Sequence, residues 1–177
     1  RLVPCGVPPH RSQPVATSQQ RVTMLQLAIK NDDRFVVDDR ELHREGPSYT
    51  VDTLISLRQE FPQSQLFLFL GTDAFAGIQT WHEWQQILDL AHIVVMKRPS
   101  ETLAMPEELT DWYTQYLVSE ESKDKLAGVV WPIDVTQLSI SATKIRESMA
   151  NGLSTKFLMP DAVISLIDML GLYSERN

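Results

Sequence analysis

Short apolar runs alternate along this chain with longer segments whose apolar residues recur every three or four positions. A short apolar run between glycine, proline or charged residues predicts a strand, and the wider periodicity predicts a helix that packs through one face. The expected strands cover residues 1–4, 35–37, 66–70, 92–96 and 128–131. The expected helices cover residues 19–30, 47–60, 81–91, 106–118, 142–151 and 160–170. This alternation favours an α/β protein with a doubly wound parallel sheet, in which several strand ends converge on one crevice.

The strand expected at Leu66–Leu70 leads into the most informative stretch of the chain. Its sequence, LFLFL, is typical of a parallel strand that is buried on both faces, and Gly71 ends it. Asp73 then stands at the carboxyl end of the strand. Open α/β sheets bind their ligands at that edge, so Asp73 is a candidate ligand contact.

The motif TWHEW follows this strand and predicts the start of a helix. Thr80 and Glu83 have the spacing of a capping box, which would start the helix at Trp81 and point its free backbone N–H groups toward the strand end. Trp84 belongs to a buried stripe with Ile87 and later apolar residues. Trp81 is out of phase with that stripe and is the better candidate for a ligand contact. A large ring beside free N–H groups suits a flat aromatic anion.

Composition narrows the class of protein. The 177 residues are 43% hydrophobic and 22% charged, which is enough for one globular domain with a sizeable core. The net charge of −7 argues against non-specific binding to nucleic acid or to a membrane surface. Cys5 has no second cysteine with which to form an internal disulfide, and the sequence shows neither a membrane-spanning apolar run nor a secretory signal. We therefore expect a protein of the reducing cytoplasm.

A phosphate site is expected near the start of the helix at 142–151. Ser141 is the natural N-cap of that helix, and Lys144 and Arg146 lie in or near its first turn. Cations at that end oppose the helix dipole, at a local cost of a few tenths of a kcal/mol. A bound phosphate would remove the conflict.

Three other positions have both a structural and a ligand-binding interpretation. His10 and Arg11 follow two prolines in a stiff loop, which is either a rigid connector or a phosphate contact. Arg98 follows the strand at 92–96, where it is either part of a solvated strand end or an anion contact. Thr50 lies in a first helical turn crowded with polar residues, which serve either as caps or as ligand contacts.

Several short motifs, in this order, resemble those of the bacterial nicotinate-nucleotide adenylyltransferases. They are VPPHR at 7–11, PSYTVDTL at 47–54, LGTDAF at 70–75, TWHEW at 80–84, KRP at 97–99, ISATKIR at 140–146 and FLMPDAVISLI at 157–167. The pattern ISxTxIR occurs across the nucleotidyltransferase superfamily. The combination of SYTxDTL with TWxEW is what resembles the nicotinate-nucleotide branch.

The resemblance implies a Rossmann-like nucleotidyltransferase fold and a specific reaction. Such an enzyme transfers the adenylyl group of ATP to nicotinate mononucleotide and forms deamido-NAD and pyrophosphate in NAD biosynthesis. ATP and nicotinate mononucleotide would be its partners, and Mg²⁺ would accompany the ATP. The chemistry would be an in-line attack helped by positioning and positive charge, without a covalent intermediate on the protein.

The same resemblance implies roles for individual residues. Trp81 would stack on the nicotinate ring, and backbone N–H groups near Thr50 and His82 would receive the nicotinate carboxylate. Gly71 and Asp73 would hold a ribose. The residues expected to face nucleotide phosphates are Arg98 and, on ATP, His10, Ser141, Thr143 and Arg146.

Two departures from the family pattern lead to further expectations. The family's GxFxPxHxGH motif does not occur in these 177 residues, so we expect it, with its phosphate-binding histidines, upstream of Arg1. Residues 1–177 would then form a single nucleotidyltransferase domain that is incomplete at its N-terminus and lacks the first central strand. An intact mass above 20.2 kDa would support this expectation. No catalytic side chain or metal ligand is assigned within the chain, and Cys5 stands where many relatives carry asparagine.

Two alternatives stay open. The first is another adenylyl- or cytidylyltransferase of the superfamily that acts on a pantetheine or alcohol phosphate, against which Trp81 argues. The second is a non-catalytic nucleotide-binding protein. The oligomeric state, a homo-oligomer included, is also open.

Overall fold

The structure is a computed structural model that describes residues 1–6, 14–97, 104–122, 124–136, 138 and 140–174. The chain divides into two compact units. Unit 1 consists of Arg1–Ser48 and Leu138–Asn177, and unit 2 of Tyr49–Gln137. Unit 2 is thus one continuous segment inserted between the two parts of unit 1.

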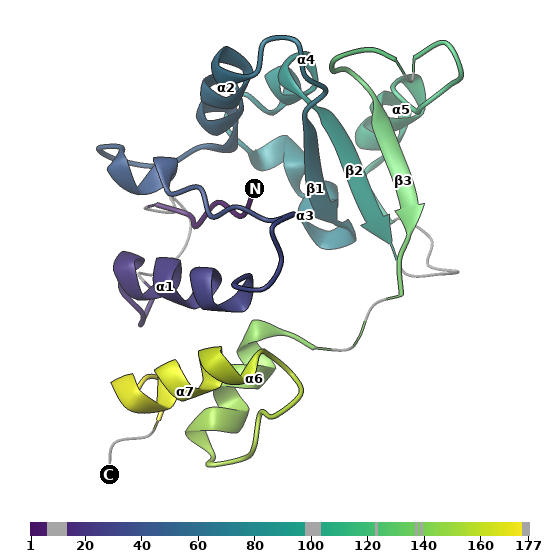
Figure 1. Cartoon of the computed structure of the whole chain (residues 1–177). Helices are drawn as coiled ribbons and strands as arrows, with labels where there is room; N and C mark the ends of the chain where they lie inside the picture. Colours follow the sequence, from purple (N-terminus) through teal and green to yellow (C-terminus); the bar gives the residue numbers. More distant parts are fainter. Residues whose placement is uncertain (7–13, 98–103, 123, 137, 139, 175–177) are drawn as a thin grey trace. The chain divides into compact units, whose positions relative to one another are not determined.

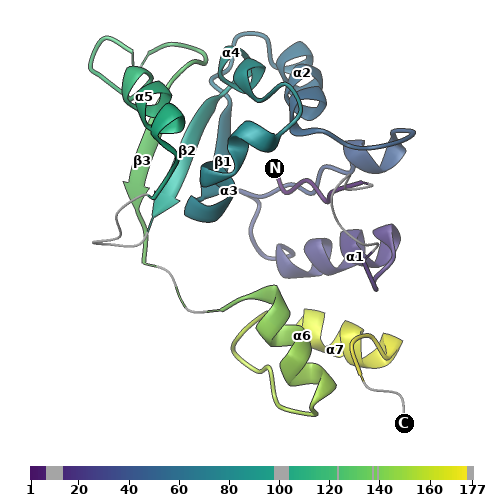
Figure 2. The ribbon, with the colours of Figure 1, turned by 180° about the vertical axis from the view of Figure 1, so that it is seen from behind.

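Unit 2 is built on a parallel sheet (Figures 1 and 2). Its strands are β1 (Phe67–Gly71), β2 (His92–Lys97) and β3 (Val130–Asp134), in the order β1-β2-β3. Leu70 lies opposite Val95 in the first pair, and Ile93 lies opposite Val130 in the second. Parallel strands with helical connections confirm the α/β prediction. The strand at 92–96 was predicted closely, whereas β3 begins two residues later than the predicted 128–131 and extends beyond it.

The helices of unit 2 contribute to one apolar core on the sheet. They are α2 (Thr50–Glu60), α3 (Thr72–Ala76), α4 (Ile87–Leu90) and α5 (Glu107–Gln115), with short 3-10 turns η2 (Ile78–Thr80) and η3 (Trp84–Gln86). Leu54, Phe75 and Leu109 bring three of these helices onto the sheet residues Leu70 and Ile93. The helix α5 is shorter than the predicted 106–118.

The opposite face of β1 corrects one prediction. Phe67 and Phe69 alternate with Leu68 and Leu70, so they point away from the core cluster. They are 42% and 59% exposed. The expectation that residues 66–70 are buried on both faces is therefore wrong, because the helices that form this core pack against the Leu70 side.

The prediction of a capping box at Thr80 is also wrong. The Thr80 hydroxyl donates to the Gly77 carbonyl over 2.8 Å instead of accepting from a later N–H group. Trp81 is extended, and Glu83 has a left-handed backbone with φ of 48°. The segment therefore forms two short turns around Trp81 where one helix beginning at Trp81 was expected.

Unit 1 contains η1 (Arg40–His43) and the helices α1 (Ser18–Ala28), α6 (Ala142–Ala150) and α7 (Asp161–Leu170). Thr17 caps α1 through a capping box with Gln20, so the cap lies one residue before the predicted Ser18. The helix α7 packs against α1 and ends at Gly171, whose φ of 61° suits glycine. The strands predicted at 1–4 and 35–37 are reduced to one parallel bridge between Leu2 and Val37.

A buried ion cluster supports this bridge. Asp38 is 7% exposed and accepts from Arg1 at 2.9 Å and from Arg40 at 2.7 Å. Burial by itself favours the neutral acid, but the bonds from Arg40 and Arg1 outweigh it and lower the pKa of Asp38 to about 2. The Asp38 N–H also donates to the Leu2 carbonyl, so side chain and backbone hold the same two segments together.

Across the described part of the chain, none of the helices combines the length and hydropathy needed to cross a bilayer.

Candidate functional site

The carboxyl end of β1 carries two of the predicted site residues. Gly71 ends β1 and precedes α3, and a Cβ placed on it would meet no atom of the described residues within 4 Å, its two chain neighbours aside. Asp73 lies in the first turn of α3 with its side chain exposed. A ligand can therefore approach this strand end closely, as an open α/β sheet requires.

An aromatic contact joins this region to the start of α2. The ring of His82 lies 4.3 Å from the ring of Tyr49, tilted by 36°. Tyr49 is the N-cap residue of α2 and Thr50 is its first helical residue, and the Tyr49 side chain makes no capping hydrogen bond. The contact therefore brings the loop of Trp81 and His82 to a helix start whose first N–H groups have no intrahelical acceptor. Sequence spacing could not predict the contact between Tyr49 and His82, because the two residues are far apart in the chain.

The two neighbouring tryptophans both pack in part on the core. Trp84 is half-buried and meets Trp112 at 5.0 Å between ring centroids, with an edge-on angle of 64°. This agrees with its prediction as a packing residue. Trp81 is also half-buried and also contacts the core cluster. Packing therefore anchors the Trp81 ring while leaving part of it accessible.

An ion pair joins the ends of β2 and β3. Lys97 Nζ lies 2.5 Å from Asp134 Oδ1, so this lysine has an acidic partner. The choice of Arg98 over Lys97 as the anion contact stays a prediction. Arg98 itself and His10 lie outside the described residues.

The candidate phosphate site belongs to unit 1. The Ser141 hydroxyl accepts from the Lys144 N–H over 3.2 Å, which confirms Ser141 as the N-cap of α6. One turn later, Arg146 Nη2 lies 3.5 Å from Thr143 Oγ1, and both side chains are exposed. The guanidinium of Arg146 also lies 6.0 Å from the centre of the Tyr173 ring. Hydroxyl and guanidinium groups are thus gathered at the start of one helix, as anion binding requires.

The residues that the structure describes include no group of three or more His, Cys, Asp or Glu side chains that could hold a metal ion. A Mg²⁺ ion needs few protein ligands when it travels with a nucleotide, because phosphate oxygens and water complete its shell.

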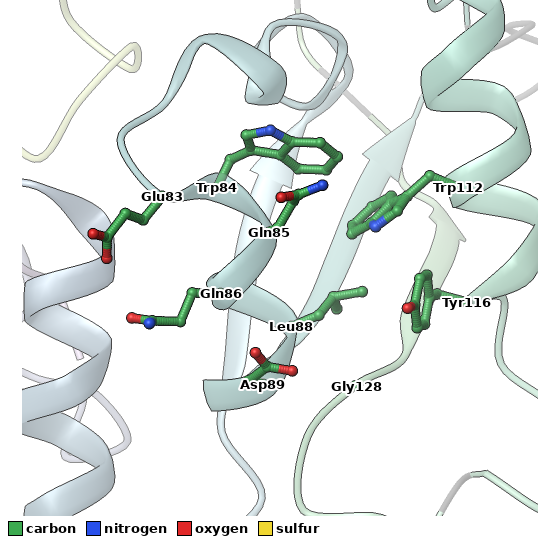
Figure 3. Close-up of a pocket in the computed structure, with 9 residues that line it drawn as sticks. All are labelled: Glu83, Trp84, Gln85, Gln86, Leu88, Asp89, Trp112, Tyr116 and Gly128. Carbon is green, nitrogen blue, oxygen red and sulfur yellow. The ribbon is translucent and has the colours of Figure 1, made fainter.

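A separate cavity of about 520 Å³ lies in unit 2 (Figure 3). Its walls come from the segment Glu83–Asp89, from α5 and from Gly128. Of the residues predicted to contact nucleotides, none that the structure describes lines it.

The chain is similar to known proteins along most of its length. The family model described as Cytidylyltransferase-like matches residues 1–148. A Pseudomonas syringae pv. tomato protein named probable nicotinate-nucleotide adenylyltransferase is 45% identical, over 100% of this chain and 81% of its own. A Methylococcus capsulatus protein of the same name is 42% identical, over 99% of this chain and 85% of its own.

Solved structures share the fold. The Plasmodium falciparum nicotinic acid mononucleotide adenylyltransferase complexed with NaAD has a TM-score of 0.68 at 18% identity. The same protein complexed with APC has a TM-score of 0.64 at 16% identity. Each match covers 97% of this chain and 80% of the solved one.

Proposed function

Because this chain belongs to the cytidylyltransferase-like family and, within it, to the nicotinate-nucleotide adenylyltransferases, we propose that it transfers the adenylyl group of ATP to nicotinate mononucleotide. The products are deamido-NAD and pyrophosphate, and the reaction belongs to NAD biosynthesis. The observation that carries this conclusion is the 45% identity to a curated relative along the whole chain.

The reaction exchanges one phosphate bond for another. A phosphate oxygen of nicotinate mononucleotide attacks the α-phosphorus of ATP, the bond from that phosphorus to the β-phosphate oxygen breaks, and pyrophosphate leaves with the bonding electrons. Such a transfer depends on alignment of the two phosphates and on positive charge around them. No protein nucleophile is needed.

Unit 2 would recognise nicotinate mononucleotide. Trp81 would stack on the nicotinate ring, while N–H groups near Thr50 and His82 receive its carboxylate. The contact between Tyr49 and His82 supports this assignment, because it brings both N–H sources to one place. Gly71 and Asp73 would hold a ribose, which the open space at Gly71 and the exposed Asp73 carboxylate support.

The remaining contacts would hold phosphates. Ser141, Thr143 and Arg146 would bind ATP, a role supported by their grouping at the start of α6. As the family pattern implies, His10 would contact a phosphate of ATP, and Arg98 would contact a nucleotide phosphate. A Mg²⁺ ion carried by ATP would offset phosphate charge during the attack.

The two units would work as one nucleotidyltransferase domain. The family match supports this proposal, because residues 1–148 include parts of both units. The acidic composition and the single cysteine favour a cytoplasmic location.

Pyrophosphate release tests the reaction. The protein should release pyrophosphate when ATP, nicotinate mononucleotide and Mg²⁺ are all present, and omission of any one should stop it. Release with a pantetheine or alcohol phosphate in place of nicotinate mononucleotide would favour a different transferase of the superfamily. Nucleotide binding without release under saturating substrates would favour the non-catalytic alternative.

Trp81→Ala tests the recognition step. Loss of the stacking ring should raise KM for nicotinate mononucleotide by about tenfold or more, the usual worth of base stacking, and should change KM for ATP much less. Trp81→Phe is the matched control, because it keeps a flat ring and should recover much of the loss. Equal effects on both substrates would show that Trp81 does not stack on the nicotinate.

A further inference from the structure

The cavity beside α5 has the size of a small-molecule site. Its volume of about 520 Å³ lies in the range of typical ligand pockets, about 300–1,000 Å³. Figure 3 shows Trp84 on one side, Trp112 and Tyr116 on α5 and just beyond it, and Leu88 between the two walls. The proposed nucleotide site uses none of these side chains.

The aromatic side chains form a wall of inclined rings. The Trp84 and Trp112 centroids are 5.0 Å apart with an angle of 64°, and the Trp112 and Tyr116 centroids are 5.3 Å apart with an angle of 52°. The rings are inclined and do not stack face to face, and all three residues line the cavity. All three side chains are half-buried, so this surface is partly shielded from water. The faces of aromatic rings attract cations, and the face of tryptophan does so most strongly.

The charges around this wall have one sign. Asp89 contributes an exposed carboxylate, and Gln85 and Gln86 contribute amides. The Glu83 side chain points away from Trp112 and Tyr116 (Figure 3), and its carboxylate lies 3.8 Å from His82 Nε2. The described residues that line the cavity include no lysine, arginine or histidine. A phosphate or nucleotide would therefore be repelled. A cation with an apolar body would match both the Asp89 carboxylate and the aromatic wall.

We propose that this cavity binds a small organic ammonium ion, with its alkyl groups against Trp84, Trp112 and Tyr116 and its charge held by Asp89. This site does not depend on the proposed adenylyl transfer. Its occupant would still touch the loop of Trp81 and His82, since Glu83 and Trp84 follow directly in the chain.

A matched pair of ligands measures how much the ammonium charge contributes to binding. Choline and its neutral analogue 3,3-dimethylbutan-1-ol have nearly the same shape, so a difference between them reports the ammonium group. Binding can be followed on the indole N–H signals of the four tryptophans by nitrogen-15 NMR at constant ionic strength, with assignment by single Trp→Phe variants. Choline should move the Trp84 and Trp112 signals saturably and leave Trp131, which does not line the cavity, in place. Equal shifts with the neutral analogue, or no saturable shift at all, would overturn the proposal.

A charge variant tests the acidic contribution without disturbing the packing. Asp89→Asn should weaken choline binding by about threefold, the size expected for a partly exposed ion pair. Glu108→Gln is the control, since it removes an exposed carboxylate from α5 that does not line the cavity. If Asp89→Asn does not weaken binding more than this control, the Asp89 carboxylate has no part in it and the proposal fails.

Trp112→Leu tests the aromatic wall. It removes a π face and should weaken choline binding by about tenfold. Trp112 also contacts Phe75 in the core, so the folded state of this variant must be checked by its unfolding midpoint. Unchanged choline affinity in a folded Trp112→Leu variant would contradict the proposal. If this variant does not fold, the Asp89→Asn variant decides whether the proposal holds.

Discussion

The imidazole of His92 is fully buried at the start of β2, with one nitrogen hydrogen-bonded. Its Nε2 lies 2.8 Å from the Lys125 carbonyl, which can only accept, so Nε2 carries the proton. Its Nδ1 is buried and has no partner among the described residues. A second proton would place an unpaired donor and a charge in the core. Burial therefore lowers the pKa of His92 below the ordinary 6.5.

This histidine should make stability depend on pH. Its pKa is lower in the folded than in the unfolded protein, so the unfolded state takes up the proton first as the pH falls. The contribution of neutral His92 to the free energy of unfolding is complete above the unfolded-state pKa of about 6.5. It is lost progressively as the pH falls below that value. The urea midpoint should fall between about pH 7.5 and pH 5, and His92→Leu should reduce that fall. The exposed His43 provides the control variant His43→Gln, and an equal reduction in both variants would contradict the assignment.

Arg58 is a second residue whose geometry has a measurable consequence. Its guanidinium donates to the carbonyls of Leu90, Phe61, Ser64 and Leu126, with the shortest bond, 2.6 Å, to Leu90. It therefore joins the end of α2 to the turn before β1 and to the segments that precede β2 and β3. These acceptors are spread in several directions, which suits the planar fork of arginine.

Arg58→Lys should destabilise the protein although it keeps the charge. An ammonium group cannot reach all of these carbonyls at once, so the free energy of unfolding should fall by about 1–2 kcal/mol, the cost of losing hydrogen bonds to one or two part-buried acceptors. Chemical denaturation gives this difference directly. Arg34→Lys, at a side chain that is 85% exposed, should change stability by less than about 0.5 kcal/mol. Similar losses in the two variants would mean that the fork geometry of Arg58 is unimportant.

At the scale of elements, the contact of Tyr49 with His82 links α2 to the loop before η3. If this contact positions the N–H groups that receive the nicotinate carboxylate, Tyr49→Ala should raise KM for nicotinate mononucleotide by about 3- to 10-fold, the worth of an aromatic pair. The KM for ATP and kcat should change little. Tyr49→Phe keeps the ring and should behave as the wild type. A loss of stability in Tyr49→Ala without a change in either KM would assign the contact a purely structural role.

Elements with strong local signals were predicted best. The apolar run of β2, the cap of α6 at Ser141 and the glycine stop of α7 all lie where the sequence indicated. Thr80 shows the limit of such signals. It has the right spacing for a cap, but its hydroxyl bonds to Gly77 and the chain turns twice so that Trp81 and Trp84 both reach the core. Tertiary packing outweighed a local preference that is typically worth about 1 kcal/mol.

The candidate site was also predictable only in part, because local sequence spacing does not reveal contacts between residues that are distant in the chain. Position at a strand end or a helix start can be read from spacing, which is how Asp73 and Ser141 were found. The contact of Tyr49 with His82 and the aromatic cavity beside α5 join residues that are distant in the chain, so no spacing rule leads to them. The individual nucleotide contacts came from family resemblance and stay predictions.

At the scale of the whole molecule, the chain leaves unit 1 at Ser48 and returns to it at Leu138. The strands of unit 2 pair with their nearest neighbours along the sequence. In unit 1, by contrast, α1 packs on α7, and the entire second unit lies between them in the chain.

This insertion sets an order of events during folding. A contact between distant segments costs loop-closure entropy, so the strand pairs of unit 2 should form early and the contact of α1 with α7 late. Once unit 2 has folded, it shortens the effective distance between its two ends and makes that late contact easier to form. In pulse-labelled hydrogen exchange during refolding, amides of β2 should gain protection before those of α1 and α7, and simultaneous protection would contradict this order. A newly made chain would therefore complete unit 1 only after α7 has been synthesised.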